Sequence, residues 1–545
     1  MQRFVKCKDA DKISFSTLLM PIQSRLFRAD FLALFLSLTV IFASYLVAER
    51  IYECLPHIED EMAYAWQAQV YADGQLTIRA PKYPSSFMVP FVVDYHGQRF
   101  AKYPPGWPVV LALGIRFGIR PWINPLLAGL VVWLTYRVGQ KLIGSACGVL
   151  AAFLTASSPF FLLNAGSLLA HPWSLVLTLA LALSWLDTFN VIHHRTQAEK
   201  NDHSVGSTRD EDSHPLKWMT VLVAGLSLGL LALTRPLTAL GVALAFFVHG
   251  LILFWRGDHS VRLRVLSIGL IAAVVAALVF VWQFAVTGNL WFNPYTLWWK
   301  YDRVGFGPGY GRMPGGHSLD YALLNLTNIL HTGGRDLFAW GKVSWLFLLS
   351  GLWAMSKNYR AWLIIALPLG LVFVYLAYWF GSSLYGPRYY FEGLPGLTLT
   401  TAAGMLWLLD WSGRFKDTWH LSRSFAMLVL SVGLVGYNLL SFLPHRLKDM
   451  YSLYNISRSR LEPFQSEQAE ALTPALVLVH IESSWTDYGT LLELEDPWLT
   501  SPFIFAISRG KFINEELAAL YPDRSIIHYY PDRPYEFYIY RYPEK

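Results

Sequence analysis

Residues 31–48 read FLALFLSLTVIFASYLVA, and residues 57–61, a short distance further on, read HIEDE. The first stretch carries no charge over 18 positions, about the length of helix that crosses the apolar core of a bilayer. The second places three carboxylates beside that membrane surface, at the head of the helical pattern EMAYAWQAQVYADG. Holding a carboxylate next to lipid costs free energy, and such residues usually pair with another group or serve a function. We therefore predict an uncleaved membrane anchor followed by an acidic cluster with a function.

The composition is typical of a membrane protein with many spans. Of the 545 residues, 54% are hydrophobic and only 15% are charged, whereas about a quarter of the residues of a soluble domain are charged. The 22 tryptophans suit interfacial belts. The formal net charge of +6 is not gathered into a basic patch with exposed aromatics, which argues against a nucleic-acid partner.

Apolar stretches of spanning length recur along the chain, and the charges between them give an orientation. Basic residues gather in the N-terminal tail and in the joint after every second span, which the positive-inside rule places in the cytoplasm. This alternation requires that residues 104–118, which are too short to cross, form an interfacial or re-entrant helix. We predict about eleven spans, near residues 31–48, 121–140, 145–163, 171–187, 217–234, 236–255, 265–287, 341–356, 361–380, 393–410 and 423–443.

The opposite, non-cytoplasmic face then carries three long pieces, residues 49–120, 288–340 and 444–545. The last piece is polar, with four short β-like runs (ALVLVHI, PFIFAIS, RSIIHYY and EFYIYRY) and a helical run, NEELAAL. We predict an α-helical transmembrane module over residues 1–443 and a small α/β domain over 444–545. Residues 195–216 are predicted to be a flexible cytoplasmic loop.

The acidic cluster allows two roles. Asp60 and Glu61 begin the predicted helix, where the helix dipole favours the ionised carboxylate. An ionised carboxylate can take the proton of an attacking hydroxyl as a general base. The same residues also suit a helix cap with solvated neighbours, and residue type alone does not separate the two roles.

Two arginines stand out because the short turns of the outward face are nearly bare of Lys and Arg. Arg235 lies in LTRP between two apolar stretches, and Arg388 lies in YGPRYY at the end of another. The guanidinium fork can hold a phosphate through two parallel hydrogen bonds. Both arginines can instead extend to the membrane interface without a specific partner.

Two observations bear on whether the protein uses a cofactor: the position of His171 and the absence of a nucleotide-binding motif. His171 suits either a hydrogen-bonded structural role or, with Glu59, Asp60 or Glu61, a divalent-cation site, and no spacing demands the metal. No phosphate loop of the form GxxxxGK[ST] is present, so we expect the energy to come from an activated substrate rather than from ATP.

In their order along the chain, these features resemble the GT-C glycosyltransferases, most closely the branch with protein O-mannosyltransferases and aminoarabinose transferases (glycosyltransferase family 39 and relatives). The resemblance covers nearly the whole chain. It lies in the Asp60–Glu61 pair after the first span, YPPGWP at 103–108, SP at 158–159, HP at 171–172, LTRP at 233–236, GPRY at 386–389 and the outward C-terminal domain.

The resemblance implies a role for each matching residue. Asp60 would be the general base and Glu61 its neighbour, while Glu59 makes a third acid that leaves the identity of the base open. Arg388, helped by Arg235 or by Lys82 and Lys102, would stabilise the departing phosphate. His171, Tyr103 and Tyr389 are further candidates for the substrate site.

It also implies an inverting transfer of a hexosyl or pentosyl sugar from a polyprenyl-phosphate donor to an acceptor lipid, glycan or protein. The expected location is the inner membrane of a cell envelope, with the N-terminus cytoplasmic and the C-terminal domain periplasmic. The alternatives are a transporter or flippase of lipid-linked sugars and, less well supported, a non-catalytic scaffold. Long outer loops, and polar groups at span ends rather than mid-span, favour the enzyme.

Overall fold

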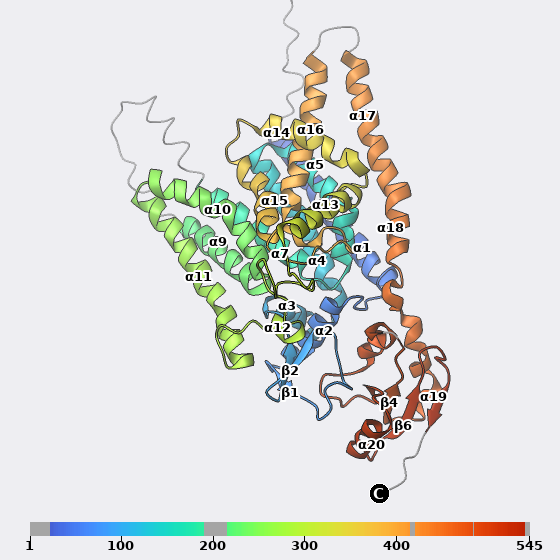
Figure 1. Ribbon diagram of the computed structural model, residues 1–545. Helices are drawn as coiled ribbons and strands as arrows, with labels where there is room; N and C mark the ends of the chain where they lie inside the picture. Colours follow the sequence, from blue (N-terminus) through green and yellow to red (C-terminus); the bar gives the residue numbers. More distant parts are fainter. Residues whose placement is uncertain (1–21, 190–214, 415–419, 483, 540–545) are drawn as a thin grey trace, which may run out of the picture.

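The computed structural model describes residues 22–189, 215–414, 420–482 and 484–539. The basic N-terminal tail before residue 22 and nearly all of the predicted loop at 195–216 lie outside these ranges. The described chain forms a helical body with a smaller α/β domain at one end (Figure 1).

Each stretch predicted to span the membrane is helical over most of its length, although the stretch at 145–163 is divided at Pro159 into two helices that meet at 60°. By length and apolarity, five described helices qualify as spans, or seven if each of two bent pairs counts as one, so the expected number of eleven stays a prediction. The helices at these stretches are α1 Ile22–Arg50, α4 Ile123–Leu142, α5 Ser145–Ala156, α6 Pro159–Gly166, α7 His171–Thr188, α9 Pro215–Thr234, α10 Pro236–Arg256, α11 His259–Thr287, α14 Leu346–Met355, α15 Ala361–Tyr375, α16 Leu394–Arg414 and α17 His420–Tyr437.

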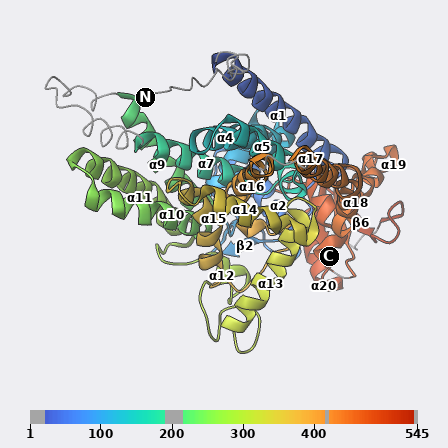
Figure 2. The same ribbon diagram turned by 90° about the horizontal axis from the view of Figure 1, so that it is seen from above.

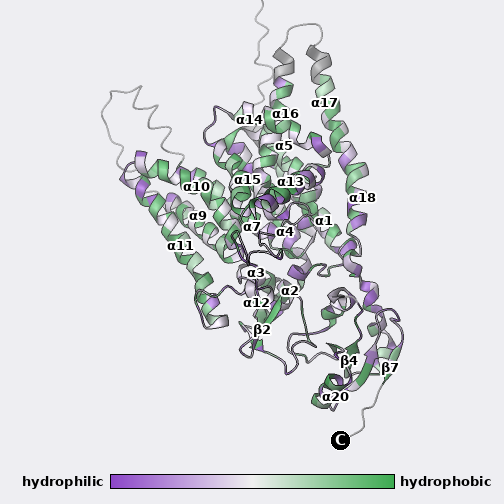
Figure 3. Ribbon diagram, viewed as in Figure 1, coloured by the Kyte–Doolittle hydropathy of each residue, from purple (hydrophilic) through white to green (hydrophobic). Residues whose placement is uncertain are grey.

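The helices are arranged as a central bundle with an arm. Helices α9, α10 and α11 diverge from the bundle on one side, and α16 and α17 extend past it at the end away from the α/β domain (Figures 1 and 2). Hydrophobic residues predominate along these outer helices, in keeping with a lipid-facing surface (Figure 3). Only 17% of the most apolar window of α11, and 6% of that of the span that contains α17, is buried in the protein.

One piece that was predicted to face outward holds more structure than the sequence suggested. Residues 288–340 contain helix α13, Leu319–Asp336, which the sequence analysis treated as loop. Its Ser318 caps the helix by accepting a hydrogen bond from the amide of Tyr321. Helix α13 meets the next helical segment at 97°, so the two form a bent pair. Polar residues recur about every third or fourth position along α13, so the helix contains no continuous apolar run of the kind that predicted the spans.

The first outward piece forms a platform beneath the bundle. Helix α2, Glu59–Ala72, packs against α3, Gly106–Arg116, the short helix predicted at 104–118. A three-stranded antiparallel sheet joins them, with β3 (Gln98–Ala101) between β1 (Ile78–Arg79) and β2 (Val92–Tyr95). A four-residue helix, α12 Tyr295–Trp298, lies beside β2.

The C-terminal segment folds as an α/β unit against this platform. Its sheet has the order β5-β4-β6-β7, parallel except for β7, and each strand falls in one of the four β-like runs. Arg120 pairs with Glu493 at 2.5 Å, and the amide of Ile507 donates to the carbonyl of Ser86 at 2.7 Å. The elements are α18 Leu443–Met450, α19 Glu467–Glu470, β4 Ala475–Val479, β5 Phe503–Ile507, α20 Lys511–Leu520, β6 Ser525–Tyr529 and β7 Phe537–Ile539.

Candidate active site

A cavity of about 670 Å³ lies where the platform, the bundle and the arm meet. Asp60 and Glu59, on the first turn of α2, line one side of it. The other polar groups come from turns that are far apart in sequence but meet here. They include Lys102, Tyr103, His171, Arg235, Asp302, Arg312, Tyr375, Tyr378, Arg388 and Tyr389.

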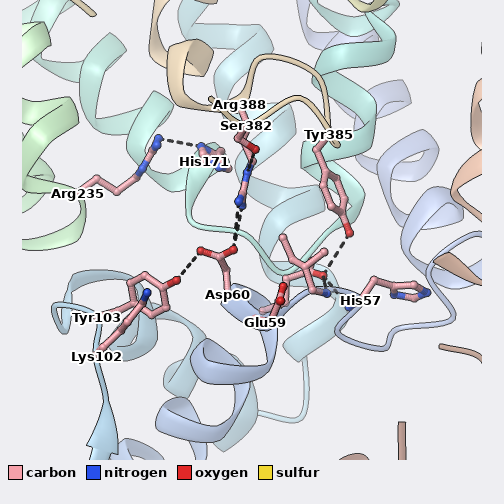
Figure 4. A network of polar contacts seen from close by, with 12 residues as sticks. His57, Glu59, Asp60, Lys102, Tyr103, His171, Arg235, Ser382, Tyr385 and Arg388 are labelled. Carbon is pink, nitrogen blue, oxygen red and sulfur yellow. Dashed lines mark hydrogen bonds and ion pairs between the residues drawn. The ribbon is translucent and has the colours of Figure 1, made fainter. Parts of the chain in front are cut away.

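Asp60 is the centre of this polar network (Figure 4). Its Oδ2 accepts hydrogen bonds from both Nη1 and Nη2 of Arg388, each at 3.2 Å. Its Oδ1 accepts a hydrogen bond from the hydroxyl of Tyr103 at 2.6 Å. Burial alone would raise the pKa of Asp60, but Arg388, Tyr103 and Lys102 together hold that pKa below its usual value. Asp60 is therefore a carboxylate at neutral pH.

Arg388 is fixed from two sides. Its Nε donates to the hydroxyl of Ser382 at 2.5 Å, and its Nη atoms donate to Asp60. The sharp turn before it depends on Gly386, whose φ of +75° is unfavourable for other residues and whose missing side chain makes room for Phe160. Only 7% of Arg388 is exposed, so its cationic head is directed into the cavity rather than to the bulk interface.

Arg235 forms a second cationic point at the cavity wall. It occupies the position just before α10, and its Nη1 donates to Glu392 at 2.6 Å and to Nδ1 of His171 at 2.8 Å. Since a guanidinium only donates, Nδ1 of His171 must accept, which places the imidazole proton on Nε2. Glu392 is fully buried, so Arg235 is needed to compensate its charge.

Lys102 occupies a cage of aromatic rings. Its Nζ lies 3.7 Å from the ring centre of Phe91 and 4.9 Å from that of Trp299, and it pairs with Asp302 at 3.1 Å. Asp302 also accepts hydrogen bonds from Tyr378 at 2.8 Å and Trp379 at 3.3 Å. The sequence analysis missed Asp302, although it is the only acidic residue between Asp258 and Asp320.

Glu61, predicted beside Asp60 as a catalytic residue, faces away from the cavity. Only 1% of it is exposed, and it accepts backbone hydrogen bonds from His57 and Leu168, both at 2.7 Å. The hydroxyl of Tyr385 also donates to it at 3.3 Å. Consecutive helical residues point about 100° apart, so Glu61 is rotated about 200° around α2 from Glu59 and is directed away from the cavity that Glu59 and Asp60 line. In this position Glu61 caps α2 and ties it to the turn before α7.

Lys82 also lies away from the site predicted for it. Its side chain is 61% exposed, and its nearest acidic partner is Glu516 of the C-terminal domain, at 3.7 Å. It does not line the cavity, because the β1–β2 connection that carries it runs along the surface of the platform. The remaining predicted residues, Glu59, Lys102, Tyr103, His171, Arg235 and Tyr389, do line it.

The C-terminal segment completes one edge of the cavity. Tyr454 lines it, and its ring meets that of Trp485 edge-on at 5.7 Å. The indole of Trp485 donates to Glu59 at 3.1 Å, and burial raises the pKa of Glu59. Ser452, Tyr454 and Asn455 all have positive φ, between 53° and 63°, a strained turn of the kind that surrounding contacts must hold in place.

The side of the cavity toward the arm is apolar. Leu237 and Leu240 of α10 and Val279 and Phe280 of α11 line it, and Leu240 and Phe280 are also exposed to the lipid-facing surface. The cavity therefore joins a polar region at the height of Asp60 to an apolar region that faces the membrane.

A divalent-cation site finds no support in the side-chain positions. Within the described ranges, no group of three or more His, Cys, Asp or Glu side chains lies close enough to hold a metal ion. His171, the neutral ligand considered in the sequence analysis, is bonded to Arg235 instead.

Comparison with solved structures identifies the fold. The aminoarabinose transferase ArnT from Cupriavidus metallidurans, solved with undecaprenyl phosphate, matches with a TM-score of 0.50, covering 90% of this chain and 89% of ArnT at 14% identity. The chain has the GT-C fold. The archaeal oligosaccharyltransferase AglB from Archaeoglobus fulgidus aligns with a TM-score of 0.48 over 90% of this chain and 69% of its own, at 13% identity. A scan against protein-family profiles found no match, and a search among curated proteins found none either.

Proposed function

We propose that this protein is an inverting glycosyltransferase that moves a sugar from a polyprenyl-phosphate donor to an acceptor hydroxyl. One observation carries the proposal: a half-buried carboxylate, Asp60, and two arginines, the buried Arg388 and the half-buried Arg235, face one cavity with an apolar wall on the side of the arm. The GT-C fold shared with ArnT, whose structure holds undecaprenyl phosphate, supports it.

The donor fits the two halves of the cavity. Its apolar chain would lie against Leu237, Leu240 and Phe280, while its phosphate would reach the guanidinium groups of Arg388 and Arg235. Negative charge grows on the phosphate as the glycosidic bond breaks, and cations already held in place stabilise that charge without reorganisation. The N–H of His171 adds a neutral donor beside Arg235.

The acceptor would approach from the edge formed by the C-terminal domain. Inversion requires the acceptor oxygen to attack the anomeric carbon from the face opposite the phosphate. The edge next to Asp60 is formed by Glu59, Tyr454 and Trp485, and none of these residues is proposed to bind the phosphate. Asp60 would take the proton of the acceptor hydroxyl, on the periplasmic side of the inner membrane.

The test uses the protein in lipid nanodiscs with a panel of polyprenyl-phosphate sugars. Release of free polyprenyl phosphate is measured with membrane extract as the source of acceptors, and the Asp60→Asn protein is the control. Release that requires Asp60 is the expected result. Movement of donor across the bilayer without release would contradict the proposal and support a flippase.

A further inference from the structure

Asp60 already has hydrogen-bond partners before any substrate arrives. Both of its oxygens accept hydrogen bonds, Oδ2 from Arg388 and Oδ1 from Tyr103. A carboxylate that accepts from a guanidinium is a weak base, because the cation favours its ionised form. The arrangement seen here is therefore poorly suited to take a proton from a hydroxyl.

Arg388 is equally engaged. A guanidinium has five N–H groups, and it binds a phosphate best through two parallel bonds from one edge. The edge formed by Nη1 and Nη2 is occupied by Asp60, and Nε, on the neighbouring edge, is occupied by Ser382. A phosphate can make the two-pronged contact only by displacing one of these partners. Displacing Asp60 leaves the bond to Ser382 intact, and that bond keeps Arg388 in place.

We propose that Asp60 and the phosphate of the donor compete for Arg388, so that arrival of the donor releases the base. The inference rests on the proposed function, since it takes the anion at Arg388 to be a lipid-linked phosphate. Acceptor activation then waits for the donor, because only an Asp60 released from Arg388 is free of the cation that weakens it as a base.

The transfer step balances with the groups present. The acceptor oxygen forms a bond to the anomeric carbon and passes its proton to Asp60. The bond between that carbon and the phosphate oxygen breaks, and the phosphate leaves with the electron pair and one additional negative charge. Protonated Asp60 is neutral and no longer competes for Arg388, so the product phosphate stays bound until Asp60 loses its proton and pairs with the arginine again.

The experiment measures equilibrium binding of decaprenyl phosphate to the full-length protein in nanodiscs. The variants are Asp60→Asn, Asp60→Ala, Glu59→Gln and Asp60→Asn combined with Arg388→Ala. We expect either Asp60 variant to bind the lipid phosphate at least about tenfold more tightly than the wild type, although neither should transfer sugar. The added Arg388→Ala change should abolish this gain.

Glu59→Gln is the matched control, because it removes the same charge from the same helical turn without touching Arg388. It should tighten binding less than about threefold. Equal tightening by Glu59→Gln would show a general effect of charge and overturn the proposal, as would unchanged or weaker binding by both Asp60 variants. Thermal unfolding of each variant shows whether a loss of decaprenyl-phosphate binding results from misfolding. A wild type that binds decaprenyl phosphate but transfers from no donor would refute the proposed function while leaving the competition measurable.

Discussion

Asp60 and Glu61 are neighbours on the first turn of α2, yet they face two different environments. Asp60 faces the cavity and meets Arg388, whereas Glu61 faces the protein interior and meets Tyr385, three residues before Arg388. The same two segments therefore make contact twice, once through an ion pair beside a cavity and once through hydrogen bonds in a closed core. A ligand can change the hydrogen-bond partners of a carboxylate beside a cavity, whereas a carboxylate enclosed by backbone amides stabilises the fold.

The largest expected effect separates the two acids by activity. Asp60→Asn should lower kcat at least about a hundredfold, the usual scale for loss of a general base. Glu61→Gln should lower it less than about tenfold, because its side chain does not line the cavity. The kcat of both variants is measured as release of polyprenyl phosphate under saturating donor. A larger loss of kcat for Glu61→Gln than for Asp60→Asn would contradict the prediction.

The second prediction concerns pH and stability. Burial raises the pKa of Glu61 from 4.5 to about 7, even though backbone amides from His57, Leu168 and Ile58 oppose the rise. The folded protein then holds this proton more tightly than the unfolded chain, so Glu61 contributes stability at low pH that is lost as the pH rises from about 4.5 through 7. The whole change amounts to about 3 kcal/mol.

Thermal unfolding of the wild type and Glu61→Gln across this range tests the prediction. Glutamine does not titrate, so the stability advantage of the wild type should shrink as the pH rises. A constant difference from pH 4.5 to 8 would mean that the folded and unfolded states hold the proton of Glu61 equally well.

The smallest effects come from the two tyrosines that donate to these acids. Tyr103→Phe removes the bond to Asp60 and should lower kcat about tenfold, the scale of a hydrogen bond to a charged group. Tyr385→Phe removes a longer bond to Glu61 and should cost about 1 kcal/mol of stability, with kcat changed less than twofold. Steady-state kinetics and thermal unfolding of both variants measure these effects. A loss of kcat confined to Tyr385→Phe, with a loss of stability confined to Tyr103→Phe, would contradict the prediction.

The sequence predicted the helices of the membrane body well because long apolar runs are a direct physical signal. It missed α13, whose apolar residues cover only one face. In the candidate site, Arg235, Arg388 and His171 could be recognised because each interrupts an otherwise apolar or uncharged stretch, and Asp60 because it belongs to an acidic cluster that follows an apolar run. The different directions of Asp60 and Glu61 could not, because the rotation of α2 depends on packing against segments more than a hundred residues away. The place of Lys82 was unpredictable for the same reason, since a surface loop has no periodic pattern to fix it.

The edge formed by Tyr454 and Trp485 has a consequence for the synthesis of the protein. Both residues follow all of the helices of the membrane body, so a nascent chain already holding Asp60, Arg235 and Arg388 still has an open cavity on this side. The ring of Tyr454, in the turn at Ser452–Asn455, can meet that of Trp485 only after the later residue has been made. The acidic cluster is thus among the first parts of the site to be made, and its enclosure is the last.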